Sequence, residues 1–300
     1  MLILQNEYLK VSVNQAKGGA ITSIFSRRTK DEWIYNNSSL KSEENSSLMY
    51  DDLWCGGFEE LFPNDAPDNV NGRILKDHGE LWMQSWDVTH RNDNSVNMQT
   101  QCTTVPAIVT KNVTLHSTTP TIIVNYRIEN VSSEEYPYLF KLHPAMRIER
   151  GDELLLNGGT VIPVDLTFSK IIDKNGEFNW PIVIDKNGRR KNLAIIPDKN
   201  EKLQEFIYVR NLSSPWCGLR RKASNEEFIL NFPSKIFPYC WFFMALGGWR
   251  DHYTVVMEPC TNFPKDLITA INNGTSAFMK PFEKLEFEIS VNIRTGNAGK

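Results

Sequence analysis

Short segments in which apolar and polar residues alternate recur along almost the whole chain. A clear example is Tyr8–Val13 (YLKVSV), which the pair Gly18-Gly19 separates from a second such segment, Ala20–Phe25. Alternation with a period of two gives a strand one apolar face, and glycine or Asn- and Asp-rich segments between strands favour turns. The same reasoning predicts further strands at Glu32–Tyr35, Trp86–His90, Val96–Thr100, Val109–Leu115, Thr121–Ile128, Tyr138–Ile148, Glu153–Leu156, Leu166–Phe168, Phe206–Val209, Phe228–Phe232, Thr254–Met257 and Leu285–Ile293.

The spacing of these segments indicates an antiparallel all-β fold. Turn residues recur at roughly ten-residue intervals in the first half, which is typical of a meander, and the sequence has no long amphipathic helical pattern. We therefore expect residues 1–300 to form a single domain, a large antiparallel β-sandwich. Polar loops are expected at Asn36–Ser47 and within Asp173–Glu205. Trp54–Asp65 (WCGGFEELFPND) fits neither period and is interpreted as an ordered loop close to a site.

Charge and cysteine content narrow the class of protein. The formal net charge is −3 with acidic and basic residues mixed along the chain, so no basic face indicates nucleic acid or a membrane surface. The first residues, MLILQNEYLKVSVN, have neither a basic region with a long apolar core nor a small-residue cleavage site, so we do not expect a secretion leader. No apolar run approaches the roughly 18 residues of a membrane span. Five scattered cysteines without a CxxC pair favour reduced thiols. We expect a cytoplasmic protein, monomeric or homodimeric, whose partner is a small molecule.

One stretch, Tyr239–Pro264 (YCWFFMALGGWRDHYTVVMEPCTNFP), combines the strongest strand pattern with candidate chemistry. An aromatic strand passes through Gly247-Gly248 into a second apolar strand that carries Glu258. A buried carboxylate without a partner is costly, so this glutamate requires either a partner or a function. We favour a general base in a cleft lined by aromatic side chains.

His78 and His143 are the two histidines with the most suggestive surroundings. His78 precedes Gly79, where the backbone can approach a ligand closely, in the sequence DHGELW. His143 lies in KLHPAM, where Pro144 is predicted to end the strand ladder and leave the imidazole at a cleft. Imidazole can both give and take a proton near neutral pH. The structural alternatives are a loop histidine paired with an aspartate and a satisfied core histidine.

Several aromatic and acidic residues are candidates for sugar contacts. The flat C–H face of a pyranose stacks on aromatic rings, which makes Trp82 and Trp249 candidates, although most tryptophans in a β domain belong to the core or its rim. Glu59 lies between apolar residues in GGFEEL and is not expected to be wholly exposed. It is a third candidate for substrate binding.

Four motifs together carry a family resemblance. GGFEELFPND, DHGELW, LHPAM and MEPCTNFP occur in the order and at roughly the spacings seen in the aldose 1-epimerase (galactose mutarotase-like) superfamily, and PFEKLEFEISVNI resembles its C-terminal strand. The resemblance covers nearly the whole chain. It implies the galactose mutarotase-like supersandwich and an enzyme that interconverts sugar anomers.

The resemblance also implies roles for individual residues. Glu258 matches the general base, His143 matches the general acid that protonates the ring oxygen, and His78 matches a second histidine that holds a sugar hydroxyl or assists protonation. Arg73 is the nearest counterpart of an arginine that precedes the His-Gly motif, at a shorter spacing. Asp251 is the nearest counterpart of an acidic residue that binds sugar hydroxyls. No cofactor and no metal are implied.

Three other functions remain open on sequence grounds. The substrate could be a hexose 6-phosphate or another acidic sugar, with Arg73, Arg147 and Arg250 as anion contacts. The chain could be a non-catalytic carbohydrate-binding protein, since a fold does not determine function. Two histidines and a glutamate are also a plausible zinc ligand set, although the sequence has no HExxH pattern.

Overall fold

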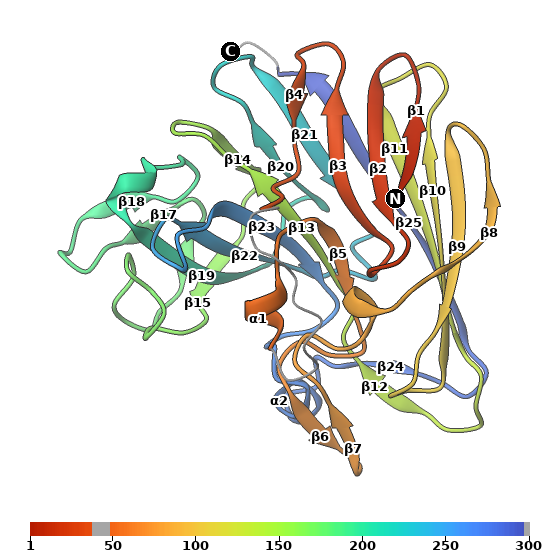
Figure 1. Ribbon diagram of the computed structural model, residues 1–300. Coiled ribbons are helices and arrows are strands. Elements are labelled where there is room, and N and C mark those ends of the chain that lie inside the picture. Colours follow the sequence, from red (N-terminus) through yellow and green to blue (C-terminus); the bar gives the residue numbers. More distant parts are fainter. Residues whose placement is uncertain (38–48, 297–300) are drawn as a thin grey trace.

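Two large antiparallel sheets make up most of the fold in the computed structural model, which describes residues 1–37 and 49–296 (Figure 1). The spatial order of the larger, 13-stranded sheet is β1 (Leu2–Gln5), β2 (Leu9–Asn14), β3 (Ala20–Ser26), β5 (Phe58–Leu61), β13 (Lys141–Arg147), β23 (Tyr253–Cys260), β22 (Tyr239–Leu246), β19 (Leu203–Arg210), β15 (Thr160–Pro163), β16 (Phe178–Asn179), β17 (Ile182–Ile184) and β18 (Arg190–Asn192), with β4 (Asp31–Glu32) paired to β3. The order of the eight-stranded sheet is β14 (Glu153–Leu156), β20 (Trp216–Arg220), β21 (Glu226–Asn231), β25 (Lys284–Thr295), β11 (Thr121–Asn130), β10 (Ala107–Leu115), β9 (Ser95–Gln101) and β8 (Asp87–Arg91).

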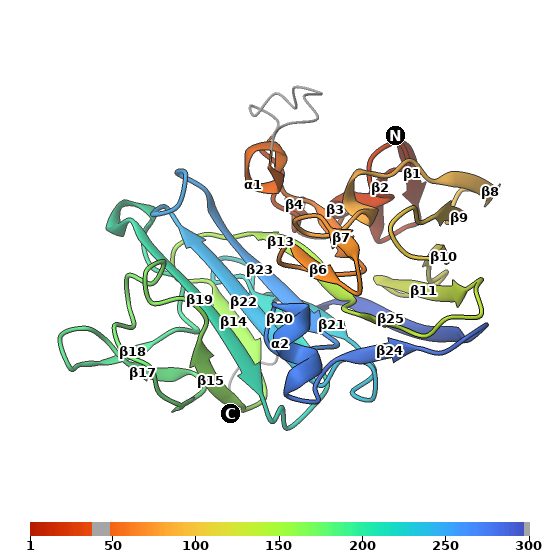
Figure 2. The same ribbon diagram turned by 90° about the horizontal axis from the view of Figure 1, so that it is seen from below.

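The remaining elements are short. They are the hairpin β6 (Asp68–Val70) and β7 (Arg73–Leu75), the pair β12 (Tyr136–Tyr138) and β24 (Ala277–Met279), the helices α1 (Tyr50–Leu53) and α2 (Leu267–Asn272), and the 3-10 helices η1 (Leu81–Met83) and η2 (Lys199–Glu201). Both α-helices pack on one face of the larger sheet: the ring of Tyr50 in α1 lies 6.0 Å from that of His143, and Leu267 of α2 belongs to one hydrophobic cluster with Trp241. The two helices are labelled in Figure 2. No helix in the described ranges has the length and apolar character needed to cross a bilayer.

The core lies between the two sheets. Every second residue of β10 is buried, and Val113 of this strand, Val124 of β11 and Val11 of β2 belong to one hydrophobic cluster that spans both sheets. Removing these apolar faces from water is the main driving force for stacking the sheets. The all-β sandwich expected from the alternating pattern is thus confirmed.

A buried ion pair also crosses this core. Lys111 of β10 donates from Nζ to Glu60 Oε1 on β5 at 2.6 Å and to the carbonyl oxygen of Gly19 at 3.1 Å. Tyr126 of β11 donates its hydroxyl to the same glutamate oxygen at 2.6 Å. Buried charges are tolerated only when they are paired and hydrogen-bonded. The pair therefore helps to set how β5 lies over the second sheet.

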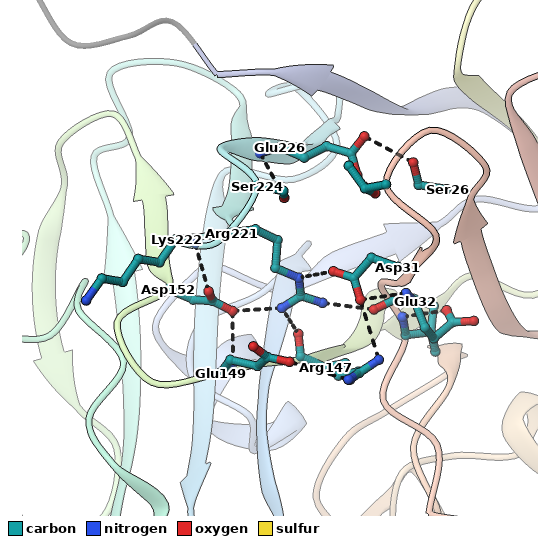
Figure 3. Close-up of polar contacts among 12 residues, drawn as sticks. Ser26, Asp31, Glu32, Arg147, Glu149, Asp152, Arg221, Lys222, Ser224 and Glu226 are labelled. Carbon is teal, nitrogen blue, oxygen red and sulfur yellow. Dashed lines mark hydrogen bonds and ion pairs between the residues drawn. The ribbon is translucent and has the colours of Figure 1, made fainter.

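A second polar network is centred on Arg221, which is 3 % exposed, in the turn between β20 and β21 (Figure 3). Its guanidinium donates to Asp152 Oδ2 at 2.7 Å, to Asp31 Oδ2 at 2.8 Å and to the carbonyl oxygens of Arg147 and Glu32. Asp31 and Glu32 form β4, and Arg147 ends β13. One arginine therefore ties the turn of the smaller sheet to two strands of the larger one.

Three local expectations are wrong. Trp54–Asp65 is not only a loop, because it contains β5, whose four residues are all buried and so show no alternation. Pro144 does not end the ladder, because β13 continues to Arg147 and Pro144 pairs with Phe58. Leu166–Phe168 forms a turn closed by Asp165, whose carboxylate accepts from the backbone N–H of Thr167.

Two expectations are left without a test. The loop predicted at Asn36–Ser47 lies, beyond its first two residues, outside the described residues. That the chain forms a single domain stays a prediction.

Candidate active site

The candidate site lies on the face of the larger sheet that points away from the second sheet. Successive residues of a strand point to opposite faces, so Lys141 and His143 of β13 share this one. Lys141 pairs with Cys260, and Ala145 with Val256, in a single register. That register places His143 directly across from Glu258 of β23. Lys141, His143 and Glu258 thus converge, although the two strands that carry them lie far apart in the sequence.

These residues form the floor of a pocket of about 230 Å³. This is somewhat below the roughly 300–1,000 Å³ of sites for drug-sized ligands, and it suits a small ligand. One wall is aromatic: Phe243 of β22 lies 5.1 Å from Trp249 and 5.6 Å from Phe206 between ring centroids, and Phe168 lies 5.2 Å from Phe243. Trp54 continues the wall next to Trp249, at 6.0 Å.

Glu258 is held by a buried lysine. Lys141 donates from Nζ to Glu258 Oε2 at 2.7 Å and to Asp65 Oδ2 at 3.0 Å, and all three side chains are at most 5 % exposed. Burial alone would lower the pKa of Lys141, but the two carboxylates raise it, so the ammonium stays charged. Burial raises the pKa of Glu258, and Lys141 opposes that rise. The second oxygen of Glu258 is left free to face the pocket.

That oxygen lies next to His143. The distance from Glu258 Oε1 to His143 Nε2 is 3.7 Å. Burial lowers the pKa of His143 well below its usual value, and the charges of Lys141 and His78 lower it further. The imidazole is therefore neutral at neutral pH. A neutral imidazole carries one proton, so its chemistry depends on which ring nitrogen holds it.

A chain of hydrogen bonds leads from the other nitrogen of His143 into the protein. His143 Nδ1 lies 3.3 Å from the hydroxyl of Tyr50, and this hydroxyl lies 2.9 Å from Glu59 Oε2. Burial raises the pKa of Glu59 to about 7. Burial, together with Glu59, raises the pKa of Tyr50 well above its usual value. The protonation of Glu59 thus decides whether Tyr50 donates its proton to Glu59 or to His143.

His78 reaches the pocket from a tight turn. Its φ is +60° and that of Gly79 is +67°, and a Cβ at Gly79 would lie 2.3 Å from the carbonyl oxygen of Phe62. Only glycine fits there. The His78 ring stacks on Tyr50 with centroids 3.7 Å apart, and its Nε2 lies 3.5 Å from Asp65 Oδ1. The conformation of the turn thus presents the imidazole beside the floor of the pocket.

The structure brings only some of the proposed site residues to the pocket. Glu258, His143, His78 and Trp249 line it. Trp82 and Glu59 lie behind Tyr50 and support it: the Trp82 ring is 4.6 Å from the Tyr50 ring in an edge-on contact.

Two proposed substrate contacts lie elsewhere. Arg73 pairs with Glu134 at 2.8 Å beside the hairpin β6–β7, and Asp251 is held on the surface by Lys199 and Lys202. Neither side chain is part of the pocket lining, because each is held by oppositely charged side chains that lie outside the pocket.

Lys141, Tyr50 and Asp65 are the site residues that sequence reasoning missed. Lys141 had a usable signal, since it precedes His143 by two residues on a predicted strand and must share its face. Asp65 belongs to a segment rich in acids, but nothing local distinguishes it from its neighbours. No local pattern marks Tyr50, because its role depends wholly on contacts with distant residues.

Within ranges 1–37 and 49–296, no group of three or more His, Cys, Asp or Glu side chains has an arrangement that could hold a metal ion.

Comparison with solved structures gives full-length matches at low sequence identity. The Slr1438 protein of Synechocystis sp. PCC 6803 matches with a TM-score of 0.72 at 16 % identity, covering 98 % of this chain and 95 % of that one. A galactose mutarotase-like protein of Lactobacillus casei matches with a TM-score of 0.71 at 14 % identity, covering 98 % and 100 %. A candidate aldose 1-epimerase of Escherichia coli K12 matches with a TM-score of 0.72 at 15 % identity, covering 98 % of both chains. No family model and no curated protein matches the sequence. The chain therefore has the galactose mutarotase-like fold.

Proposed function

We propose that this chain, which has the galactose mutarotase-like fold, is an aldose 1-epimerase-like enzyme that interconverts the α and β anomers of a free sugar without a cofactor. The observation that carries the proposal is the pairing of Glu258 with His143, 3.7 Å apart and buried at the floor of a pocket. The hydroxyl that loses a proton and the ring oxygen that gains one are both bonded to C1 of the sugar. Their base and acid must therefore be close neighbours.

In the proposed reaction Glu258 Oε1 takes the proton of the C1 hydroxyl. The C1 oxygen forms the carbonyl as the bond from C1 to the ring oxygen breaks, and His143 Nε2–H protonates the departing ring oxygen. Rotation about the C1–C2 bond then turns the other face of the aldehyde toward the hydroxyl that contains the former ring oxygen. The steps then run in reverse and close the ring to the other anomer. Positioned acid–base catalysis of this type contributes roughly 10²–10⁴-fold in rate.

A neutral His143 can donate from Nε2 only if Nδ1 receives a proton at the same time. Tyr50 supplies that proton and regains one from protonated Glu59, at separations of 3.3 Å and 2.9 Å. The net transfer is thus from Glu59 to the ring oxygen, balanced by the proton that Glu258 takes from C1. This relay gives a buried glutamate with a pKa of about 7 a function in the reaction.

Lys141 is the positioning residue for the base. By occupying Oε2 of Glu258 it leaves Oε1 as the oxygen that meets the substrate, and its charge opposes the rise in pKa that burial causes. Asp65 anchors Lys141 from its other side. The aromatic wall offers π-faces to the C–H face of the sugar, and His78 is placed to hold a hydroxyl.

The test is anomer exchange measured by magnetisation-transfer NMR on glucose and galactose. We expect acceleration over buffer by the wild type and its loss in Glu258→Gln, with sugar binding retained. Glu205→Gln is the matched control, because Glu205 is a fully buried glutamate of β19 outside the pocket lining. It should keep its exchange activity. If the wild type binds sugar but does not accelerate anomer exchange, the proposed enzymatic activity is contradicted and a non-catalytic carbohydrate-binding protein is favoured.

A further inference from the structure

We infer that the pocket selects uncharged aldoses over phosphorylated or otherwise acidic sugars, and that Asp51, one of its lining residues, determines this specificity. The inference rests on the proposed function for the identity of the ligand as a sugar. It goes beyond that function by naming the charge class of the sugar and the side chain that discriminates.

The first observation is an excess of acids in the pocket. Five carboxylates line it, those of Asp51, Asp65, Asp77, Asp165 and Glu258. The described lining also contains two lysines and no arginine. Lys141 is held by the carboxylates of the floor at 2.7 and 3.0 Å, so it has no free charge to offer a ligand.

The second lysine, Lys265, does not reverse this balance. Its charge acts on Asp65 and Asp165, two carboxylates of the same pocket. An incoming phosphate would therefore compete with those carboxylates for one ammonium, while two further carboxylates, of Asp51 and Asp77, repel it. Juxtaposed like charges at a binding site are an effective means of rejecting a wrong ligand.

The arginines that the sequence suggested as anion contacts are occupied elsewhere. None of the three lines the pocket, and each is paired with acidic side chains. The pairs are Arg73 with Glu134 at 2.8 Å, Arg147 with Asp31 and Glu149 at 3.4 Å each, and Arg250 with Asp52 at 2.7 Å. A bidentate arginine site for a phosphate is thus missing from the described part of the pocket.

Asp51 is the carboxylate best suited to test the effect. It lies on α1 and lines the pocket, whereas Asp77 touches His78 and Asp65 touches Lys141, so those two cannot be changed without disturbing the floor. The next residue, Asp52, points away from the pocket to Arg250. Asp51 and Asp52 therefore form a matched pair, with the same charge and the same helix but only one side chain in the pocket.

The experiment measures binding of glucose, galactose and their 6-phosphates, through the intrinsic fluorescence of the pocket tryptophans Trp54 and Trp249 or by calorimetry. We expect the wild type to bind the uncharged sugars at least about tenfold more tightly, a difference that shrinks as salt is added because the repulsion is screened. Asp51→Asn should reduce the ratio of the dissociation constant of the 6-phosphate to that of its parent sugar several-fold, because phosphate binding becomes stronger. Asp52→Asn, combined with Arg250→Met so that no unpaired arginine is left beside Trp249, should leave the ratio unchanged.

Two outcomes would overturn the inference. One is that the wild type binds a 6-phosphate as tightly as its parent sugar, and the other is that both variants change the ratio equally. The outcome is separable from that of the proposed function, because binding is read without turnover. Selective binding without acceleration of anomer exchange would contradict the proposed enzymatic activity but would support the inferred selectivity of the pocket. If none of these sugars binds, both proposals are wrong.

Discussion

Lys141 Nζ lies 2.7 Å from Glu258 Oε2, and both side chains are buried beneath the pocket. Nζ also lies 3.0 Å from Asp65, so one ammonium neutralises two carboxylates. A buried cation between two acids is difficult to replace, because its removal leaves two uncompensated charges in a medium of low polarity. The proposed base therefore depends on a residue that itself need not touch the substrate.

Replacing Lys141 by methionine should shift the pH dependence of the exchange rate. Without the ammonium, burial and the neighbouring Asp65 raise the pKa of Glu258 further, so a larger share of the base is protonated at any given pH. We expect the acid limb of the rate profile to move to higher pH. We also expect unfolding free energy to fall by about 3–5 kcal/mol. The position of the acid limb is measured by NMR exchange across pH, and the free energy of unfolding is measured by denaturant titration.

Lys111→Met separates the two effects. Lys111 also forms a buried pair, with Glu60 at 2.6 Å, but it lies in the core between the sheets. This variant should lose comparable stability while the pH profile keeps its position. A purely structural role for Lys141 is indicated if the two variants behave alike.

The titration of Glu59 should give the pH profile of the exchange rate an alkaline limb near the pKa of this residue, about 7. Below that pH it is protonated and donates to Tyr50, which then donates to His143 Nδ1 and leaves the proton on Nε2. Above it the carboxylate accepts from Tyr50, and Nε2 loses the proton that the reaction needs. The charged and titratable groups around Glu59 are Tyr50, Lys17, His78 and Glu60. The exchange rate should therefore decline as pH rises through 7.

Glu59→Gln tests this assignment, because an amide N–H can donate a hydrogen bond to Tyr50 at every pH but cannot release a proton into the relay. The variant should lose the alkaline limb, and its exchange rate should fall by roughly 10²-fold at all pH values. A limb that persists unchanged in Glu59→Gln would assign the titration to another group.

Tyr50→Phe should interrupt the relay between Glu59 and His143. The ring still stacks on His78, at 3.7 Å in the native protein, so the shape of the pocket is retained. We expect the exchange rate to fall by roughly 10²-fold at all pH values, with little change in sugar affinity. Parallel exchange and binding measurements check this. Unchanged turnover would show that the hydroxyl is not part of the proton path.

Arg221→Met should destabilise the fold without changing the chemistry of the pocket. The guanidinium is 3 % exposed and binds Asp152 and Asp31, so its loss leaves the buried Asp152 without this ion pair and Asp31 with Arg147 as its remaining cation. We expect about 3–5 kcal/mol less unfolding free energy in denaturant titration. Arg189→Met removes an exposed arginine and should change stability by less than about 1 kcal/mol. Equal losses in both variants would contradict a structural role for this network.

The strands and several site residues were readable from the sequence because their signals are local. Alternation in Val109–Leu115 and Thr121–Ile128 identified β10 and β11, whose outer faces are more exposed to solvent than their inner faces. The motifs around His78, His143 and Glu258 pointed to side chains that line the pocket. Strand β5 was not predicted, because both of its faces are buried and its sequence shows no alternation.

By itself the sequence determined which residues of a strand share a face, since the period of two is a property of the backbone. It did not determine which strands are neighbours or in which register they pair. Only the tertiary structure decided that His143 lies across from Glu258, that Lys141 joins Glu258 to Asp65, and that Arg73 lies away from the pocket. The reason is that register between distant strands is set by the packing of the whole sandwich, to which hundreds of weak contacts contribute.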